Sequence, residues 1–170
     1  MEQLQKDCGN YLAFFSSYEF LQQVKEELER NLPKHDIHLI IQSRQMSETD
    51  RDLFIKQFNA QQNVLGLAVL GGAFSEGIDL PGDALKGAFI ATLGLPQLNA
   101  VNEHMRQRLQ TEYQQGYNFT YLFPGIQKVV QAAGRVIRTQ QDKGYLWLMD
   151  DRFEQPEIQR LLPTWWDIKN

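Results

Sequence analysis

The sequence contains one cysteine, Cys8, among its 170 residues. A single cysteine excludes an internal disulfide, a cysteine-rich zinc site and a self-contained iron–sulfur cluster, and it is typical of a reducing compartment. The longest apolar run, residues 64–70, is far too short to span a membrane, and the first residues lack the apolar segment of a secretory signal. We therefore expect a cytoplasmic protein with no metal site of its own and no membrane contact.

An excess of basic residues is also missing, because 17 lysines and arginines stand against 21 aspartates and glutamates, for a net charge of -4. This balance argues against a protein that coats nucleic acid through bulk electrostatic attraction. The phosphate-binding pattern G-x-x-x-x-G-K-[ST] is absent as well, which disfavours an enzyme that binds a nucleotide unaided. A local basic site remains compatible with this composition.

What the sequence does contain is an alternation of short apolar runs with amphipathic segments. Strands that are apolar throughout and separated by helices predict a parallel sheet covered on both faces, an α/β doubly wound fold. In such sheets ligands bind beyond the carboxyl ends of the strands. The predicted strands are residues 11–15, 37–42, 64–70, 87–93 and 144–150, and the predicted helices include 18–32, 47–59, 99–115 and 124–138. In the helix at 47–59, Ser47 and Asp50 resemble a capping box, and Leu53, Phe54 and Phe58 form the expected buried stripe.

The predicted helix at 124–138 carries a polar stripe. At about 100° per residue, Gln131, Arg135 and Arg138 fall on one narrow face, opposite an aliphatic face, and Gly134 on the flank leaves room for another backbone. From residue 124 to 144 the sequence has four basic residues against one acidic residue. The planar guanidinium group suits phosphate recognition, whereas the alternative is a solvated helix face.

A second polar segment, GGAFSEGIDLPG at residues 71–82, follows the third predicted strand. Gly77 permits a positive φ angle, and Ser75, Glu76 and Asp79 are the polar side chains that such a loop would display. Asp79 can accept hydrogen bonds from sugar hydroxyls, and Glu76 can pair with an arginine. The alternative is a plain connection between a strand and a helix.

Taken together, three segments resemble motifs IV, V and VI of superfamily 2 DNA helicases of the XPD/Rad3/DinG group, with bacterial DinG-like members closest. They are NYLAFFSSYEFLQQV, VLGGAFSEGIDLPGDALKGAFIATLGLP and YLFPGIQKVVQAAGRVIRTQQDKGYLWLMDDRF. The most specific parts are Q-x-x-G-R-x-x-R, the later D-x-R at Asp150 and Arg152, and the string SEGID. The resemblance assigns residues 10–153 to one RecA-like domain, 1–9 to a lead-in and 154–170 to a C-terminal helix and tail.

The resemblance implies the second of two motor domains of an ATP-dependent DNA helicase. Its partners would be single-stranded DNA and an N-terminal motor domain in the same parent chain, and translocation would run 5′→3′. ATP with Mg would be bound mainly by that first domain, which in the family also carries an iron–sulfur insertion. We therefore expect this chain alone to be inactive as an ATPase.

The resemblance also implies roles for individual residues. Arg138 is the expected arginine finger, Arg135 a second γ-phosphate contact and Gln131 a polar partner, the catalytic set of the shared site. The residues expected on the nucleotide side are Glu76, Gly77, Asp79 and Gly134.

DNA phosphates are expected at Ser16, Ser17, Gly72 and Ser75. For Ser16 and Ser17 the residues leave an alternative open, since two serines after a strand also serve as helix caps. A second function class stays open too, that of a catalytically silent RecA-like module that binds DNA or a protein.

Overall fold

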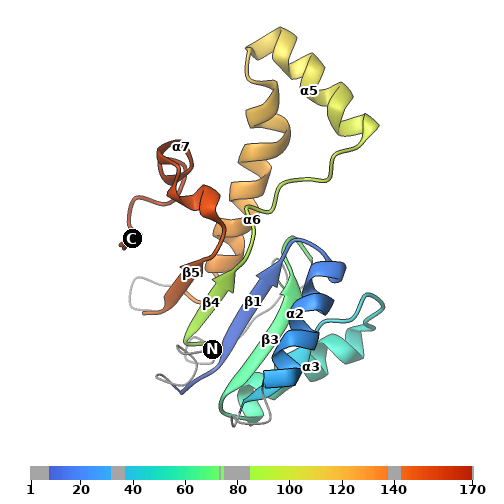
Figure 1. Ribbon diagram of the computed structural model, residues 1–170, viewed down its shortest axis with the longest axis vertical. Helices are drawn as coiled ribbons and strands as arrows, with labels where there is room; N and C mark the ends of the chain where they lie inside the picture. Colours follow the sequence, from blue (N-terminus) through green and yellow to red (C-terminus); the bar gives the residue numbers. More distant parts are fainter. Residues whose placement is uncertain (1–7, 32–36, 73, 75–84, 138–142, 170) are drawn as a thin grey trace.

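The computed structural model describes residues 8–31, 37–72, 74, 85–137 and 143–169. Strands and helices alternate along the chain, as the apolar runs predict (Figure 1). The elements are β1 (Tyr11–Phe15), α2 (Tyr18–Asn31), β2 (His38–Ile41), α3 (Glu48–Ala60), β3 (Val64–Val69), β4 (Gly87–Ile90), α5 (Ala100–Tyr113), the π-helix η3 (Asn118–Leu122), α6 (Phe123–Ala133), β5 (Tyr145–Leu148), the 3-10 helix η4 (Asp151–Glu154) and α7 (Pro156–Gln159).

The described strands form one five-stranded sheet in the order β2-β3-β1-β4-β5, and every pair of neighbours is parallel. The predicted α/β doubly wound fold is therefore confirmed. β1 is the central strand, with Phe14 opposite Ala68 of β3 on one side and Ile90 of β4 on the other. Because all five strands run the same way, their carboxyl ends lie along one edge of the sheet.

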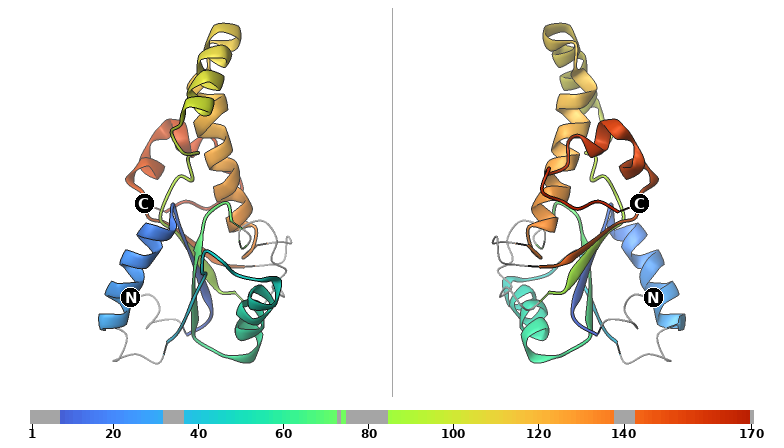
Figure 2. Two further views of the ribbon diagram at one scale, coloured as in Figure 1. Left: turned by 90° about the vertical axis from the view of Figure 1, so that its right-hand side faces the viewer. Right: turned by 90° about the vertical axis from the view of Figure 1, so that its left-hand side faces the viewer.

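The side chains of β1 alternate between two hydrophobic clusters, one on each face of the sheet. Leu12 and Phe14 point into the cluster that α3 and α6 cover, whereas Tyr11, Ala13 and Phe15 point into the cluster under α2. All five residues are buried, which is the reason this strand reads as a continuous apolar run. Figure 2 shows the two layers, with α2 on one side of the sheet and α3 on the other.

Serine and asparagine side chains cap the helices that cover the sheet. Ser47 and Asp50 form a capping box at the start of α3, with reciprocal side-chain and backbone hydrogen bonds, as the sequence predicts. Asn99 caps α5 by accepting a hydrogen bond from the backbone N–H of Asn102 at 2.9 Å. Leu53, which the helical spacing assigns to the buried stripe of α3, is instead 53% exposed.

Helix α6 is shorter than predicted. It begins at Phe123, with Pro124 in the first turn, but it ends at Ala133 and not at residue 138. Gly134 is the C-cap, and the backbone N–H of Arg135 donates to the carbonyl of Ala132, three residues back, at 3.1 Å. Gly134 has a φ angle of -63°, so the helix ends by tightening into a turn with hydrogen bonds between residues three apart and without a left-handed residue.

One glycine in the sheet is required by close packing. At Gly66 of β3, a Cβ atom would lie 2.6 Å from Cζ of Phe58 and 2.8 Å from Cδ2 of Leu12. The missing side chain therefore makes the space that the Phe58 ring of α3 fills. This contact fixes how closely α3 approaches the sheet.

We expect Gly66→Ala to lower the free energy of unfolding by about 1–3 kcal/mol, because the added methyl overpacks the core. Adding Phe58→Leu in the same chain makes room for that methyl. The double variant should then lose less stability than the sum of the two single variants. Urea denaturation followed by circular dichroism measures all four proteins, and strict additivity would contradict the packing argument.

Candidate functional site

The carboxyl ends of β1 and β3 bring two of the predicted segments together. Ser16 and Ser17 follow β1, whereas Gly71 and Gly72 follow β3, and the two strands are neighbours in the sheet. The backbone N–H of Leu70 donates to the carbonyl of Phe15 at 2.9 Å, which extends the pairing to the last residue before each segment. Residues 55 positions apart in the sequence thus share one edge of the sheet.

Ser17 caps helix α2. Its Oγ accepts a hydrogen bond from the backbone N–H of Phe20 at 3.1 Å, and its carbonyl accepts one from Leu21 at 3.0 Å. The capping interpretation is therefore confirmed for Ser17. Ser16 precedes the cap and has an exposed side chain. The two serines differ in role, with one hydroxyl used by the helix and the other facing outward.

A lysine from α6 lies against the glycine turn after β3. Gly71 has a φ angle of +77°, and a Cβ atom there would lie 3.0 Å from Cδ and 3.4 Å from Nζ of Lys128. Gly72 continues the turn, with its N–H 3.2 Å from the carbonyl of Val69. The segment that carries the arginine motif therefore contacts the start of the glycine-rich segment, and the lysine places a positive charge there. The sequence shows Lys128 only as part of a local charge balance.

Gln42 is a buried polar residue that the sequence does not single out. Its Oε1 accepts a hydrogen bond from the backbone N–H of Val69 at 2.8 Å, and its Nε2 donates to the hydroxyl of Tyr18 at 2.9 Å. One side chain thus joins the ends of β2 and β3 to the first turn of α2. The feature of the sequence that could have indicated this role is an amide residue placed directly after the apolar run of β2.

Arg44 places a second cation at the same edge. It pairs with Glu19 of α2 and lies over the Tyr18 ring, 5.3 Å from the centroid. The backbone N–H of Glu19, the Ser17 hydroxyl and Arg44 hold the pKa of Glu19 below its ordinary value. An open pocket of about 530 Å³ lies here, between the first turns of α2 and the residues after β2.

The arginine motif is described up to Ile137. Gln131 is exposed near the end of α6, while Gly134 and Arg135 are half-buried in the turn that follows. At Gly134 a Cβ atom would meet only carbonyls of its own turn, at 3.4 Å, so the described residues do not use the close approach that this glycine allows. Five predicted site residues lie outside the described residues, namely Ser75, Glu76, Gly77, Asp79 and Arg138.

Asp150 and Arg152 form a paired structure at the carboxyl end of β5. Asp150 caps η4, accepting from the backbone N–H of Arg152 at 3.1 Å and from its Nε and Nη2 at 2.8 and 2.6 Å. The Arg152 side chain and backbone, with a backbone N–H from Leu93, hold the pKa of Asp150 below its ordinary value. The D-x-R pattern therefore stabilises the chain where it leaves the sheet.

The described part of the chain contains neither a cluster of metal-binding side chains nor a membrane-spanning helix. No three histidine, cysteine, aspartate or glutamate side chains in those residues gather as they would around a metal ion. Among the helices that the structure describes, none has the length and apolar character needed to cross a membrane.

Comparison with known proteins identifies related sequences. The family model described as "Helicase C-terminal domain" matches residues 1–169. ATP-dependent DNA helicase chl-1 of Caenorhabditis elegans is 29% identical over 161 residues, which cover 91% of this chain and 19% of the relative. ATP-dependent DNA helicase DinG of Photobacterium profundum is 30% identical over 145 residues, which cover 83% of this chain and 20% of the relative.

Solved structures agree with the sequence comparison. A structure titled as an XPD helicase superposes with a TM-score of 0.74 at 25% identity, covering 94% of this chain and 28% of the solved chain. The chain thus spans about a fifth of the curated relatives named here and just over a quarter of this structure. The fold and the sequence therefore point to the same group of proteins.

We expect Ser17→Ala to lower the free energy of unfolding by about 1 kcal/mol, because the first turn of α2 loses its cap. Ser16→Ala is the matched control and should leave stability nearly unchanged, since its side chain is exposed. Thermal denaturation of the two variants compares them directly. Equal losses would show that the Ser17 hydroxyl does not stabilise the helix.

Stability should fall in acid through Asp150. Its lowered pKa means that the folded protein binds this proton more weakly than the unfolded chain, so the stabilisation is present above the ordinary value of 3.8. It is lost as the pH falls through the lowered folded value. Urea denaturation at pH 7 and pH 3 should show a smaller decrease for Asp150→Asn than for the unchanged protein. Asp151→Asn, at the exposed neighbouring carboxylate, is the control and should retain the full decrease.

Proposed function

The chain belongs to the family of helicase C-terminal domains, and on that basis we propose that it is the second RecA-like motor domain of an ATP-dependent DNA helicase of the XPD/DinG type. Its named relatives are ATP-dependent DNA helicases, and the chain corresponds to about a fifth of their length. The remaining length accommodates a first motor domain. The domain extends over residues 10–153, with 1–9 as a lead-in and 154–170 as a C-terminal helix and tail.

The observation that carries this proposal is the contact between α6 and the turn after β3. Lys128 lies against Gly71, so the helix that leads into the arginine motif rests on the start of the glycine-rich segment. Sequence segments that resemble motifs V and VI thus meet at the carboxyl edge of the parallel sheet, where α/β proteins bind ligands. A domain that couples nucleotide binding to DNA binding needs a contact between the two motifs that carry these functions.

On the nucleotide side, Arg138 is the arginine finger of the proposal, with Arg135 as a second γ-phosphate contact and Gln131 as a polar partner. In phosphoryl transfer a guanidinium group stabilises the charge that develops on the transferred phosphoryl oxygens. Arg135 lies half-buried in the turn directly after α6. Gly134, Glu76, Gly77 and Asp79 complete this side, with Asp79 at the nucleotide sugar.

The other half of the nucleotide site belongs to the first motor domain of the parent. That domain would supply the Walker loop and the Mg ligands, and it is also where an iron–sulfur cluster would be held. This chain would contribute positively charged arginine side chains to the nucleotide site between the two domains. It would therefore not hydrolyse ATP appreciably by itself.

On the DNA side, Ser16, Ser17, Gly72 and Ser75 are the proposed phosphate contacts. Hydroxyl and backbone N–H groups at this edge bind phosphates without reading the bases, as a motor on single-stranded DNA requires. The exposed hydroxyl of Ser16 suits this role directly, whereas that of Ser17 is already engaged as a cap. Movement 5′→3′ along the strand is part of the proposal.

We expect Arg138→Ala in the complete helicase to lower ATP turnover by about 10³-fold or more, with a much smaller change in ATP affinity, because the arginine acts on the transition state. Arg51→Ala, at an exposed arginine of α3, is the control and should leave both unchanged. DNA-stimulated phosphate release and nucleotide binding are the two measurements. Unchanged turnover would remove Arg138 as the finger, and full ATPase activity of this chain alone would refute the shared site.

A further inference from the structure

Helices α5 and α6 form a hairpin that extends beyond the sheet, with η3 continuing directly into α6 (Figure 1). In α5, which the structure describes throughout, no residue is buried. Half of the twelve large hydrophobic side chains exposed in the described part of the chain lie on this hairpin or its approach. They are Leu98, Val101, Met105, Tyr113, Tyr117 and Phe119.

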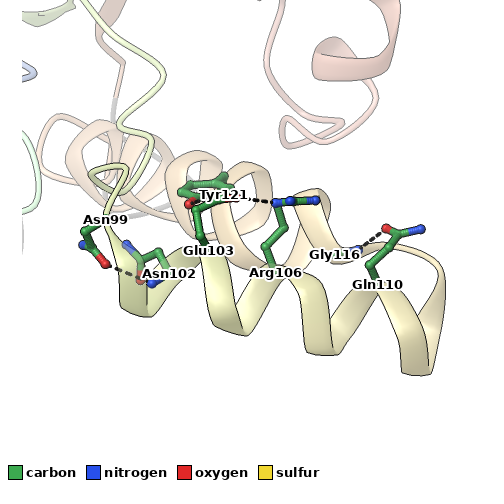
Figure 3. A network of polar contacts seen from close by, with 7 residues as sticks. All are labelled: Asn99, Asn102, Glu103, Arg106, Gln110, Gly116 and Tyr121. Atoms are coloured by element: carbon green, nitrogen blue, oxygen red, sulfur yellow. Dashed lines mark hydrogen bonds and ion pairs between the residues drawn. The ribbon is translucent and has the colours of Figure 1, made fainter.

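A polar contact between the two arms of the hairpin, which are α5 and the continuous helix η3–α6, fixes its shape. The Tyr121 hydroxyl donates to Glu103 Oε1 at 2.7 Å, and Arg106 Nε donates to Oε2 of the same carboxylate at 2.9 Å (Figure 3). The Tyr121 hydroxyl, followed by Arg106, holds the pKa of Glu103 below its ordinary value. Tyr121 itself is buried, so the carboxylate is anchored to the second arm.

The turn between the arms is equally constrained. Gln114 adopts a left-handed conformation with a φ angle of 58°, and the N–H of Gly116 donates to Gln110 Oε1 at 2.9 Å. A Cβ atom at Gly116 would lie 2.1 Å from the carbonyl oxygen of Arg106, so only glycine fits against α5 here. Residues 113–119, which we call the tip, therefore present their side chains from a defined backbone.

The exposed side chains of the tip are aromatic. Tyr113, Tyr117 and Phe119 are 59%, 50% and 43% exposed. The Tyr113 and Phe119 rings meet edge to face, 5.7 Å apart, and Phe119 contacts Phe123 in the same way at 5.4 Å. The Tyr117 ring contacts the buried Tyr121 instead, with 5.6 Å between the ring centroids. Each ring is thus held by another aromatic ring while a large part of its surface faces outward. The tip has no aliphatic residue. Its other members are three amide residues and a glycine, namely Gln114, Gln115, Asn118 and Gly116.

The charges of the hairpin do not oppose the approach of a polyanion. From residue 113 to residue 141 the sequence has no aspartate or glutamate. The two acids of α5 are each paired with an arginine, Glu103 with Arg106 at 2.9 Å and Glu112 with Arg108 at 3.6 Å. A nucleic acid that approaches the tip therefore meets no unpaired carboxylate on the described hairpin.

The direction of the hairpin adds a positional argument. The arrowheads of β1 and β4 point toward it in Figure 1, so it rises from the carboxyl edge of the sheet. Ser16 and Gly72, the proposed phosphate contacts, lie along that edge. π-Helical segments such as η3 are rare in proteins, and those that occur often lie at functional sites. A single-stranded nucleic acid whose phosphates bind at this edge of the sheet would therefore continue beside the hairpin.

We propose that the tip is a base-stacking site for single-stranded nucleic acid, with Tyr113, Tyr117 and Phe119 as its platform. Aromatic side chains stack on bases of any sequence, and one such contact contributes about 1–3 kcal/mol. This inference rests on the proposed function, because it places bases beyond the phosphate contacts of the same strand. It adds a contact with the bases to a site whose other groups bind only the backbone.

The test compares two oligonucleotides of equal length and charge, one of thymidines and one in which the central sugars are abasic. The protein should bind the thymidine strand about tenfold more tightly, the factor that about 1.4 kcal/mol represents. Tyr117→Ala with Phe119→Ala should make the two affinities equal, and Tyr117→Trp should keep the difference. Val101→Ala with Met105→Ala, at exposed apolar residues of α5 outside the tip, is the matched control and should also keep it.

Fluorescence anisotropy measures the four proteins, and circular dichroism checks that each is folded. Tyr117→Ala alone, at a half-exposed ring, repeats the test if the double variant does not fold. If the tip variants bind both strands as the unchanged protein does, the stacking site is refuted and the aromatic tip is a surface for a protein partner. If the unchanged protein binds neither strand, the proposed function fails first, and the tip proposal with it.

Discussion

The parallel pairing of β1 between β3 and β4 is the constraint on which the structure depends. It buries a strand on both faces, so that Phe14 and Phe15 contribute to different hydrophobic clusters. It also sets the carboxyl ends of three strands side by side, and their following segments therefore meet. The serines after β1 and the glycines after β3 owe their proximity to this pairing.

The sequence predicts the elements of this fold well because burial leaves a direct mark on it. A strand buried on both faces must be apolar throughout, and the residues of β1 and β3 show this without ambiguity. The Ser47 capping box was equally readable, since its hydrogen bonds join residues three positions apart. Helical spacing was less reliable at the edges of a stripe, and Leu53 is exposed although it lies beside the buried Phe54.

The candidate site was predictable as a set of residues but not as an arrangement. Short motifs name Gln131, Gly134 and Arg135, yet the straight helix drawn through them was wrong, because Gly134 ends α6 and turns the chain. Lys128 contacts a glycine 57 positions earlier, and no local pattern encodes that distance. Gln42 and the tip turn at Gly116 were missed for the same reason, since each is defined by a partner on another element.

The continuity of η3 with α6 has a structural consequence. Residues 118–133 form one helical rod, whose outer end bears Phe119 and whose inner end leads into the turn of Arg135. Near its middle, Gly125 packs so closely that a Cβ atom would lie 2.6 Å from the carbonyl oxygen of Leu93. That contact joins the helical rod to the segment that follows β4. Phe119 and the turn of Arg135 therefore lie at opposite ends of one continuous helical element that is packed against the rest of the domain near its middle.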